Sequence, residues 1–372
     1  HLYADMNYDG IFGVEEELGE EFGAYVNEGN VIDVTINGMG PGVIPWKLEV
    51  TDTGNAYRRA SVQGYFELVT AYEEEIRVLQ VTKSKGNFYI DLEAMYKKKD
   101  DSVLARLLKD AESNSNIAFE FETVTPDELA DNLGKNPKYL NQWDIVVLTV
   151  DDGVAVDSAA FTNYINEGRS LLVCSQNKSG NSAGLTPETL GWSSGRTFVS
   201  LGAANQYHRY AGLNSGMYEP GRAGMRADKI NEGSILYYPY EMTGSSFAFA
   251  EKMAENGTGL RASEYLLNFE NNLKSEQTAT YVTTWLTFGG NRDTAYGISP
   301  KDARNNYYCY SKGNVVYLAQ SEYPYIFGEG ELAAAAMGAD ECKFFVNALM
   351  AAYSAGVHGS DVSIVSGFAQ NS

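Results

Sequence analysis

The sequence predicts an α/β fold with a mostly parallel sheet, preceded by a small β-rich domain. Short apolar runs such as Ile76–Val81 and Ile145–Val150 are typical of parallel strands buried on both faces. Segments with a helical apolar period separate these runs, beginning with residues 101–108. Before residue 73 the pattern instead consists of short alternating runs divided by turn residues, which is typical of β-hairpins.

Residues 1–72 form the predicted β-rich domain. Asn, Gly and Pro at 37–42 provide a turn within it, and the acidic run at 73–75 marks its expected boundary. The segment is shorter than the roughly 100 residues of a complete seven-strand immunoglobulin sandwich. Its expected strands are Val31–Ile36, Trp46–Val50 and Ser61–Val69.

Residues 73–356 form the predicted α/β domain. Helix-capping signals occur at Asp101, at the Thr-Pro-Asp-Glu segment 125–128 and at Asp157. The alternation of strands and helices predicts a flavodoxin-like sheet with right-handed crossovers and helices on both faces. The expected strands are Ile76–Val81, Ile117–Phe121, Ile145–Val150, Leu171–Cys174, Ile235–Tyr238, Thr280–Leu286, Asn306–Tyr310 and Val315–Leu318.

The α/β domain is expected to end with a helix. This amphipathic helix is expected from Asp340 to Gly356, because its apolar residues share one face and Gly favours a helix end. Residues 357–372 are then a linker or the start of a further module, since Asp361–Val365 has the pattern of a strand.

Composition restricts the function. The chain has 372 residues, 44% of them hydrophobic, and no stretch of about 20 apolar residues that could enter a membrane. Its net charge of −21 argues against nucleic acids and anionic membranes, which both require a basic surface. Three cysteines in apolar surroundings are expected to be buried free thiols.

The N-terminal sequence matches the calcium-loop pattern D-x-[DN]-x-[DN]-G-x5-E without a mismatch. Gly10 permits the turn, and a strand from residues 1–4 is expected to enter the loop where an EF-hand has a helix. A helix is expected to leave it from Val14. The alternative interpretation is an acidic turn that matches by chance. The predicted calcium ligands are the side chains of Asp5, Asn7, Asp9 and Glu16 and the backbone carbonyl of Ile11.

Several segments together resemble an uncharacterised domain family of Gram-positive surface proteins. The segments are Ile76–Val81, Trp143–Val150, Gly168–Val173, Ala303–Tyr308, Tyr310–Val315 and Phe344–Tyr353. The resemblance implies a core similar to the ThuA-like and class I glutamine-amidotransferase-like folds, within long secreted chains that also carry immunoglobulin-like modules. The chain departs from the expected pattern where histidine-bearing segments would follow two strands, because it has Ser-Gln-Asn at 175–177 and Gln-Ser-Glu at 320–322.

Few residues suit nucleophilic catalysis. Cys174 ends a predicted strand, which is roughly where an amidotransferase nucleophile would lie, but it lacks the flanking glycines of a nucleophile elbow. A packed cysteine is the favoured interpretation. His208 is the histidine that a Cys/His pair would have to use, and a surface or hydrogen-bonded role is favoured for it.

Carboxylates are the remaining catalytic candidates. Asp151 and Asp152 follow the strand at 145–150, and doubly wound folds bind ligands at the carboxyl ends of strands. A helix-capping loop is the alternative interpretation of this pair. Glu322 follows the strand at 315–318 and can serve with either aspartate as acid and base for glycosidic chemistry.

The sequence also contains residues of the kinds that bind a dinucleotide or a glycan. The Gly-Glu-Gly segment at 328–330 resembles a dinucleotide fingerprint, but its glutamate would repel a pyrophosphate, so nucleotide binding is rejected. A glycan would require aromatic faces, and any ligand site is expected in the long insert at 175–233. The aromatic candidates, for which core packing is the alternative, are Trp192, Tyr207, Tyr210, Tyr237, Tyr238 and Tyr240.

These observations favour a non-enzymatic, calcium-stabilised segment of a bacterial extracellular or cell-surface protein, used for binding or display. A glycan or cell-envelope component is the expected partner, and further modules of the same chain are expected. The alternative is an extracellular glycan-active hydrolase or transferase that uses paired carboxylates. A third possibility is a purely structural spacer, which predicts no cleft.

Overall fold

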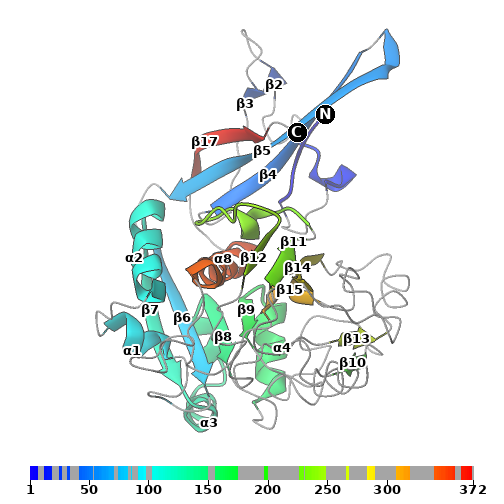
Figure 1. Ribbon diagram of the computed structural model, residues 1–372. Helices are drawn as coiled ribbons and strands as arrows, with labels where there is room; N and C mark the ends of the chain where they lie inside the picture. Colours follow the sequence, from blue (N-terminus) through cyan, green and yellow to red (C-terminus); the bar gives the residue numbers. More distant parts are fainter. Residues whose placement is uncertain are drawn as a thin grey trace, which may run out of the picture.

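Two sheets contain most strands of the molecule (Figure 1). The computed structural model describes residues 1–6, 12–18, 25–26, 32–33, 42–52, 54–70, 74–82, 85, 91–97, 103–149, 156–174, 197–199, 226–229, 231–248, 265–267, 283–289, 307–318, 339–356 and 362–370. No helix in these ranges is both long and apolar enough to cross a membrane.

The larger sheet has nine strands and consists of a parallel and an antiparallel part. The ladders from β16 to β7 are parallel, whereas those from β12 to β16 are antiparallel. The predicted α/β class is therefore confirmed, with five parallel strands in the sheet. In spatial order the strands are β12 (Ser246–Ala248), β11 (Arg226–Lys229), β14 (Thr283–Gly289), β15 (Tyr307–Lys312), β16 (Val315–Leu318), β9 (Ser170–Cys174), β8 (Ile145–Thr149), β6 (Glu74–Thr82) and β7 (Ile117–Val124).

The smaller sheet is antiparallel and brings the two ends of the chain together. Its spatial order is β1 (Leu2–Ala4), β4 (Gly42–Asp52), β5 (Asn55–Thr70) and β17 (Val362–Gln370). β17 comes from the segment expected to be a linker or the start of a further module, and that expectation did not anticipate its pairing with β5. Two short ladders complete the strands: β2 (Tyr25–Val26) with β3 (Ile32–Asp33), and β10 (Thr197–Val199) with β13 (Tyr265–Leu267).

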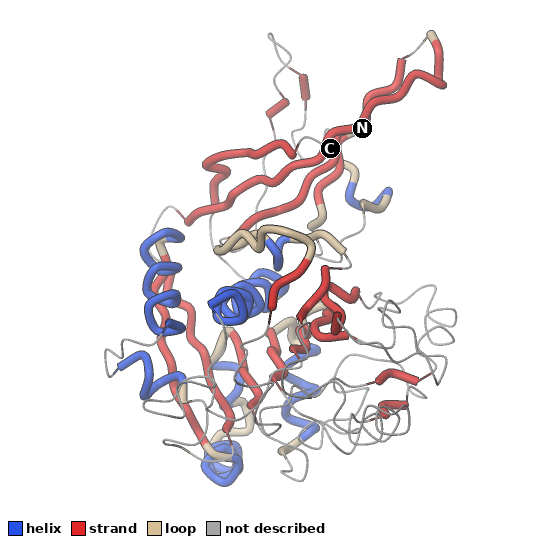
Figure 2. Tube along the Cα trace, in the orientation of Figure 1, coloured by secondary structure: helices blue, strands red, loops and turns tan. Residues whose placement is uncertain are grey.

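Helices lie on both faces of the larger sheet, drawn in blue beside its strands in Figure 2. Successive strand residues point to opposite faces. Phe121 packs against Tyr96 with ring centroids 5.1 Å apart, while Glu122 accepts a hydrogen bond of 2.6 Å from the Tyr139 hydroxyl. The helices are α1 (Leu92–Lys97), α2 (Val103–Ser115), α3 (Pro126–Lys135), α4 (Ser158–Asn166) and α8 (Ala339–Ala355), with 3₁₀ turns η1 (Val14–Glu16), η3 (Tyr139–Gln142) and η7 (Ser234–Leu236).

Capping side chains lie at the starts of α3 and α4, where the sequence predicts them. The Thr125 side chain accepts from the Glu128 N–H at 3.3 Å, and the Glu128 carboxylate accepts from the Thr125 N–H at 2.7 Å. Asp157 accepts from two N–H groups of α4, each at 3.0 Å. Gly168, with φ of 83°, follows α4 as predicted. These local signals fix where the helices begin along the sheet.

The two sheets contact each other through β4, β5, η7 and α8. Val43 of β4 belongs to the main core, and Tyr65 of β5 packs on Tyr237 with ring centroids 4.4 Å apart. The opposite face of the small sheet contributes Ile44 and Leu68 to a second, smaller core. The part of the small sheet around Val43 and Tyr65 therefore packs against the core of the larger sheet.

Two sequence expectations are corrected. Residues 235–238 were expected to form a strand, but the chain forms η7 there. The Asn347 amide of α8 donates to the carbonyls of Ile235 and Tyr240 at 3.0 and 2.6 Å and accepts from the Tyr240 N–H, so the segment bonds to a helix side chain. The helix expected from Val14 is a single 3₁₀ turn, after which Glu17 bridges to Tyr3.

Candidate functional site

The first candidate site is the acidic N-terminal loop. β1 leads into Asp5, as the predicted strand entry requires, and the Asp5 N–H donates to the Pro45 carbonyl at 2.9 Å. Asp5 is only 1% exposed and Glu16 only 5%. The first and last predicted ligands of the loop therefore both lie inside the protein.

Backbone hydrogen bonds draw the two ends of this loop together. The Glu16 carboxylate accepts from the N–H of Met6 at 2.9 Å and from the N–H of Gly13 at 3.3 Å. Because Met6 directly follows Asp5, Glu16 closes the loop beside its first residue. Calcium loops of this pattern likewise use their first and last residues as carboxylate ligands.

The other three predicted ligands, Asn7, Asp9 and Ile11, lie outside the described residues. Within the described ranges, no three side chains of His, Cys, Asp or Glu gather closely enough to hold a metal ion. Calcium binding thus stays a prediction that rests on the complete sequence pattern and on two buried carboxylates.

The second candidate site is the carboxyl edge of the parallel strands. Open α/β sheets bind ligands at this edge. β6 and β8 end there in buried threonines, Thr82 and Thr149, and β9 ends in buried Cys174. Gln80 and Thr123 lie one or two residues before the ends of β6 and β7 and are also buried.

Gln80 connects these strand ends through its side-chain amide. Its Nε2 donates to Thr149 Oγ1 at 2.7 Å, and its Oε1 accepts from Thr123 Oγ1 at 3.2 Å and from the Leu92 N–H at 2.8 Å. Thr82 Oγ1 is buried and has no hydrogen-bond partner in the described part of the chain. The edge therefore has a polar floor made of buried, hydrogen-bonded side chains.

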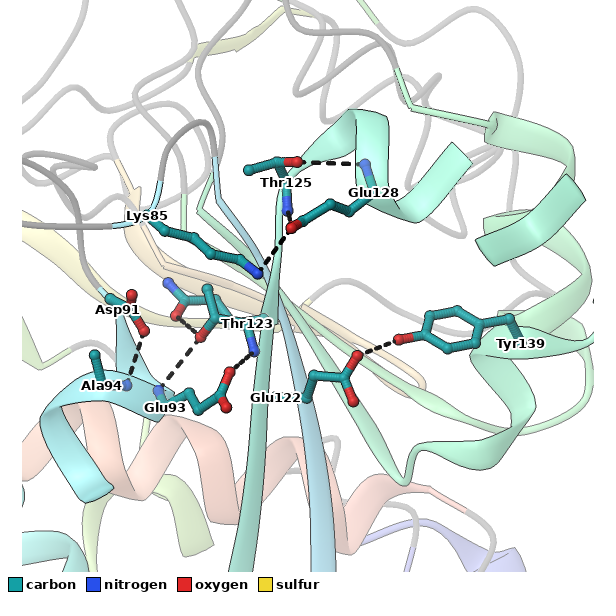
Figure 3. Close-up of polar contacts among 10 residues, drawn as sticks. Lys85, Asp91, Glu93, Ala94, Glu122, Thr123, Thr125, Glu128 and Tyr139 are labelled. Carbon is teal, nitrogen blue, oxygen red and sulfur yellow. Dashed lines mark hydrogen bonds and ion pairs between the residues drawn. The ribbon is translucent and has the colours of Figure 1, made fainter. Parts of the chain in front are cut away.

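The same network positions α1 on β7 (Figure 3). The Glu93 N–H donates to Thr123 Oγ1 at 3.3 Å, and the Glu93 carboxylate accepts from the Thr123 N–H at 2.9 Å. Asp91 caps the helix by accepting from the Ala94 N–H at 2.9 Å. Burial raises the pKa of Glu93, but hydrogen bonds from Lys97 and the Thr123 N–H outweigh it and lower the pKa overall.

Lys85, shortly after β6, brings a positive charge to this edge. Its Nζ lies 2.9 Å from Glu128 Oε2, in the first turn of α3 (Figure 3). The Thr125 N–H and Lys85 together lower the pKa of Glu128. Both charged side chains are more than 40% exposed, so this ion pair contributes little to stability.

The cysteines are packed side chains, as the sequence suggested. Cys174, Cys309 and Cys342 are all buried free thiols. Burial raises the pKa of Cys174, and it raises that of Cys342 to about 12. A thiol whose pKa is raised by burial holds little thiolate at neutral pH, so Cys174 is a poor nucleophile.

The structure separates the other predicted site residues into two groups. Tyr237, Tyr238 and Tyr240 are packed against the main core, so core packing, the alternative interpretation of these aromatics, is correct for them. Tyr240 also donates its hydroxyl to the Leu107 carbonyl at 2.5 Å. The candidates Asp151, Asp152, Glu322, His208, Trp192, Tyr207 and Tyr210 lie outside the described residues.

Sequence reasoning missed the role of Gln80 and Thr123. A usable signal was present, because Gln80 is a polar residue inside the apolar run of β6. A buried polar side chain needs hydrogen-bond partners, so its position indicates a network.

No protein-family model matches the chain, and no curated protein is significantly similar to it in sequence. The N-terminal acidic loop and the carboxyl edge of the parallel strands are therefore the two features that indicate a function.

Proposed function

We propose that this chain is a non-enzymatic, calcium-stabilised segment of a bacterial extracellular or cell-surface protein that binds or displays a partner. The observation that carries the proposal is the burial of Asp5 and Glu16 at the first and last ligand positions of a complete calcium-loop pattern. The N–H groups of Met6 and Gly13 hold the buried Glu16 carboxylate at the last ligand position, next to the residue that follows Asp5. Asn7, Asp9 and the Ile11 carbonyl supply the remaining oxygen ligands.

The role of calcium in this proposal is structural. The loop contacts the small sheet through the bond from Asp5 to Pro45 of β4, and the Leu18 N–H donates to the Leu2 carbonyl at 2.6 Å. A cation bound by the loop would therefore stabilise β1 on β4. Millimolar calcium outside cells fills even weak sites, which favours an extracellular location.

The proposed fold is flavodoxin-like, with the small sheet as a preceding β-rich domain. Numbered along the chain, the five parallel strands have the spatial order 2-1-3-4-5, which is the flavodoxin-like order. This order agrees with the resemblance to an amidotransferase-like core. A glycan or envelope component is the proposed ligand, and the carboxyl edge of the parallel strands, where Lys85 is exposed, is where it would bind.

Two features favour binding over catalysis. Cys174, at the position closest to an amidotransferase nucleophile, is a buried thiol with a raised pKa. Gln80 uses both ends of its amide to hold β7, β8 and α1, so this group serves positioning. Both features suit a preserved fold whose strand ends present polar groups to a ligand.

Thermal unfolding with calcium and with excess chelator tests the proposal. Calcium should raise the melting temperature by about 5 °C at a hundredfold excess over Kd, where binding adds about 2.7 kcal/mol. Asp5→Asn and Glu16→Gln should each abolish most of this rise. The matched control is Glu17→Gln, because Glu17 is adjacent but lies partly exposed beside His1.

The control variant must keep the calcium response of the unmodified protein. A melting temperature that is identical in calcium and chelator would refute calcium stabilisation. A glycan-array screen on the stable form then tests the proposed ligand class. Binding that is unchanged in Lys85→Glu, which alters an exposed side chain at the same edge, would argue against the strand-end site.

A second candidate function is glycan hydrolysis or transfer by paired carboxylates. β8 and β16 lie on either side of β9, so their ends are about 10 Å apart at a strand spacing of about 4.8 Å. Asp151 and Asp152 follow β8 in sequence, and Glu322 follows β16. Separations of about 5–10 Å suit acid and base carboxylates in glycosidases. Release of reducing sugar from a polysaccharide, abolished by Glu322→Gln, would support this function over the first.

A further inference from the structure

The hairpin of β4 and β5 extends beyond the sheet to which it belongs. β1 pairs with β4 only at residues 46–48, and β17 pairs with β5 only from Gln63 onward. Residues 50–62 are therefore a two-stranded ribbon, here called the arm, which projects away from the rest of the molecule in Figure 1. In the described part of the chain, both edges of the arm are open.

The arm is exposed on both faces. Tyr57 is 98% exposed and Val50 56%, and they are two of the four exposed large apolar side chains in the described residues. Neither described core cluster includes a residue of the arm. The bonds from Gly54 N–H to Asp52 at 2.7 Å and from Tyr57 N–H to Asn55 at 3.1 Å shape its tip locally.

Such a ribbon is suited to pairing with another strand. An isolated two-stranded hairpin is marginally stable in water, and an open edge presents unpaired N–H and C=O groups. Extended peptides use these edges to add a strand, with main-chain hydrogen bonds giving affinity and side chains giving specificity. An exposed tyrosine provides a large contact area that suits a binding hot spot.

Charge indicates the kind of partner. The arm carries Arg58 and Arg59 against Asp52, a net charge of +1, whereas the whole chain has a net charge of −21. Arg58 is 3.9 Å from Asp52 and its side chain is 78% exposed, so the pair neutralises little. A second copy of the arm would bring two further arginines to the same interface, and like charges directly opposite each other across a strand pair are unfavourable.

We propose that the arm binds an acidic, extended peptide segment of another protein or module by strand addition to β5. The Arg58 and Arg59 guanidinium groups pair with carboxylates of the added strand, and Tyr57 packs on one of its side chains. The proposal goes beyond calcium stabilisation, because it involves none of the predicted calcium ligands and remains testable if calcium does not bind.

The test uses the full chain and a fluorescein-labelled ten-residue peptide built from Glu-Glu-Thr-Thr repeats. These repeats place carboxylates on both faces of the added strand, as the consecutive Arg58 and Arg59 require. Fluorescence anisotropy should show saturable binding. A peptide with the same side chains but N-methyl groups on alternate residues should bind at least about tenfold more weakly, because it cannot form a full ladder. A lysine–threonine peptide should not bind detectably.

Charge reversal on the arm locates the site. Arg58→Glu with Arg59→Glu should weaken binding at least about tenfold, and Tyr57→Ala should weaken it by a smaller factor. The matched control is Arg106→Glu with Lys138→Glu, which makes the same change in net charge at exposed positions of the α/β part. All variants should keep the melting temperature of the unmodified protein, since the altered side chains are exposed.

Three results would overturn the proposal. Absence of saturable binding would reject the acidic strand as partner. Equal binding of the N-methylated peptide, or of an anionic polysaccharide, would show simple charge attraction. Self-association in analytical ultracentrifugation that Tyr57→Ala abolishes would identify a second copy of the chain as the occupant.

Discussion

Two of the described strand edges, that of β7 and that of the arm, differ in how they are protected. β7 is the outer strand of the larger sheet, yet its Phe119 N–H donates to the Glu112 carboxylate at 2.6 Å and its Thr123 N–H to Glu93 at 2.9 Å. Glu112 comes from α2 and Glu93 from α1. On the arm of the smaller sheet, the bonds to the N–H groups of Gly54 and Tyr57 come from the arm itself.

The two edges therefore differ in how available they are to a partner strand. Natural proteins protect sheet edges with charged side chains or with covering elements, because an open edge templates pairing with other chains. β7 has both kinds of protection, since α1 and α2 lie beside it and supply the carboxylates. The arm extends past β1 and β17, so its edges remain open to a further strand.

The largest expected effect on the free energy of unfolding comes from removing the buried Gln80 side chain, which lies on β6 beside the protected strand β7. Gln80→Ala removes the partner of Leu92 N–H, Thr123 Oγ1 and Thr149 Oγ1, which together hold α1 against β7. The Leu92 N–H is left without its acceptor, which costs about 1–3 kcal/mol. Thr123 Oγ1 and Thr149 Oγ1 each lose one hydrogen bond, worth about 1 kcal/mol, but keep another, with the Glu93 N–H and the Val81 carbonyl. The free energy of unfolding should therefore fall by about 3 kcal/mol. Urea unfolding at neutral pH measures this change.

Gln63→Ala is the matched control for that variant. Gln63 is also a strand glutamine, but its side chain is exposed on β5 near the base of the arm. Its removal should change the free energy of unfolding by less than about 0.5 kcal/mol. If the two variants were equally stable, the amide network around Gln80 would not be a structural element of the edge.

The sequence predicted the α/β class and many boundaries because those signals are local. The Thr125 capping box and the Asp157 cap act within a few residues, and the apolar runs of β8 and β9 reflect burial on both faces. The two-residue turn that joins β15 to β16 is equally local, and its Gly313 adopts a positive φ of 54°.

Long-range relations were not accessible in this way. β17 pairs with β5 across almost 300 residues, and no local pattern specifies that partner. Asn347 replaces a strand partner for residues 235–240, which the apolar run at Ile235 did not reveal. In the candidate sites, the local loop pattern was enough to predict Asp5 and Glu16 as ligands. The role of Gln80 could not be predicted in this way, because it depends on β7 and β8 being the neighbours of β6.

An intermediate effect is expected from removing one carboxylate that protects β7. Glu112→Ala takes away the acceptor of both the Phe119 N–H and the Tyr96 hydroxyl, each bonded to Glu112 Oε1. Hydrogen bonds to a charged group contribute about 1.5–3 kcal/mol, so the loss should be about 2 kcal/mol. Urea unfolding and native-state hydrogen exchange at Phe119 are the two measurements.

Glu120→Ala provides the contrast on the same strand, because Glu120 is exposed and lies on the other face of β7 from Phe121. It should leave both measurements within about 0.5 kcal/mol of the unmodified protein. Faster exchange at Phe119 in Glu120→Ala than in Glu112→Ala would contradict edge protection by Glu112.

The smallest effect is a pH dependence of the same edge at Glu93. Its pKa is lower in the folded protein than in the unfolded chain, because the bonds from Lys97 and the Thr123 N–H outweigh the effect of burial. The carboxylate therefore stabilises the fold above its unfolded pKa of about 4.3, and this contribution disappears as the pH falls through the lower folded pKa.

Glu93→Gln should accordingly destabilise the protein by less than about 1 kcal/mol at pH 7, with the difference from the unmodified protein vanishing near pH 3. Unfolding curves of both proteins between these pH values measure it, and exchange of the Thr123 amide should accelerate in parallel. The arm amides of Arg58 and Arg59 should not follow this titration. A difference that grows as the pH falls would mean that Glu93 acts through its protonated form, and β7 would then be protected by α1 packing and not by its charge.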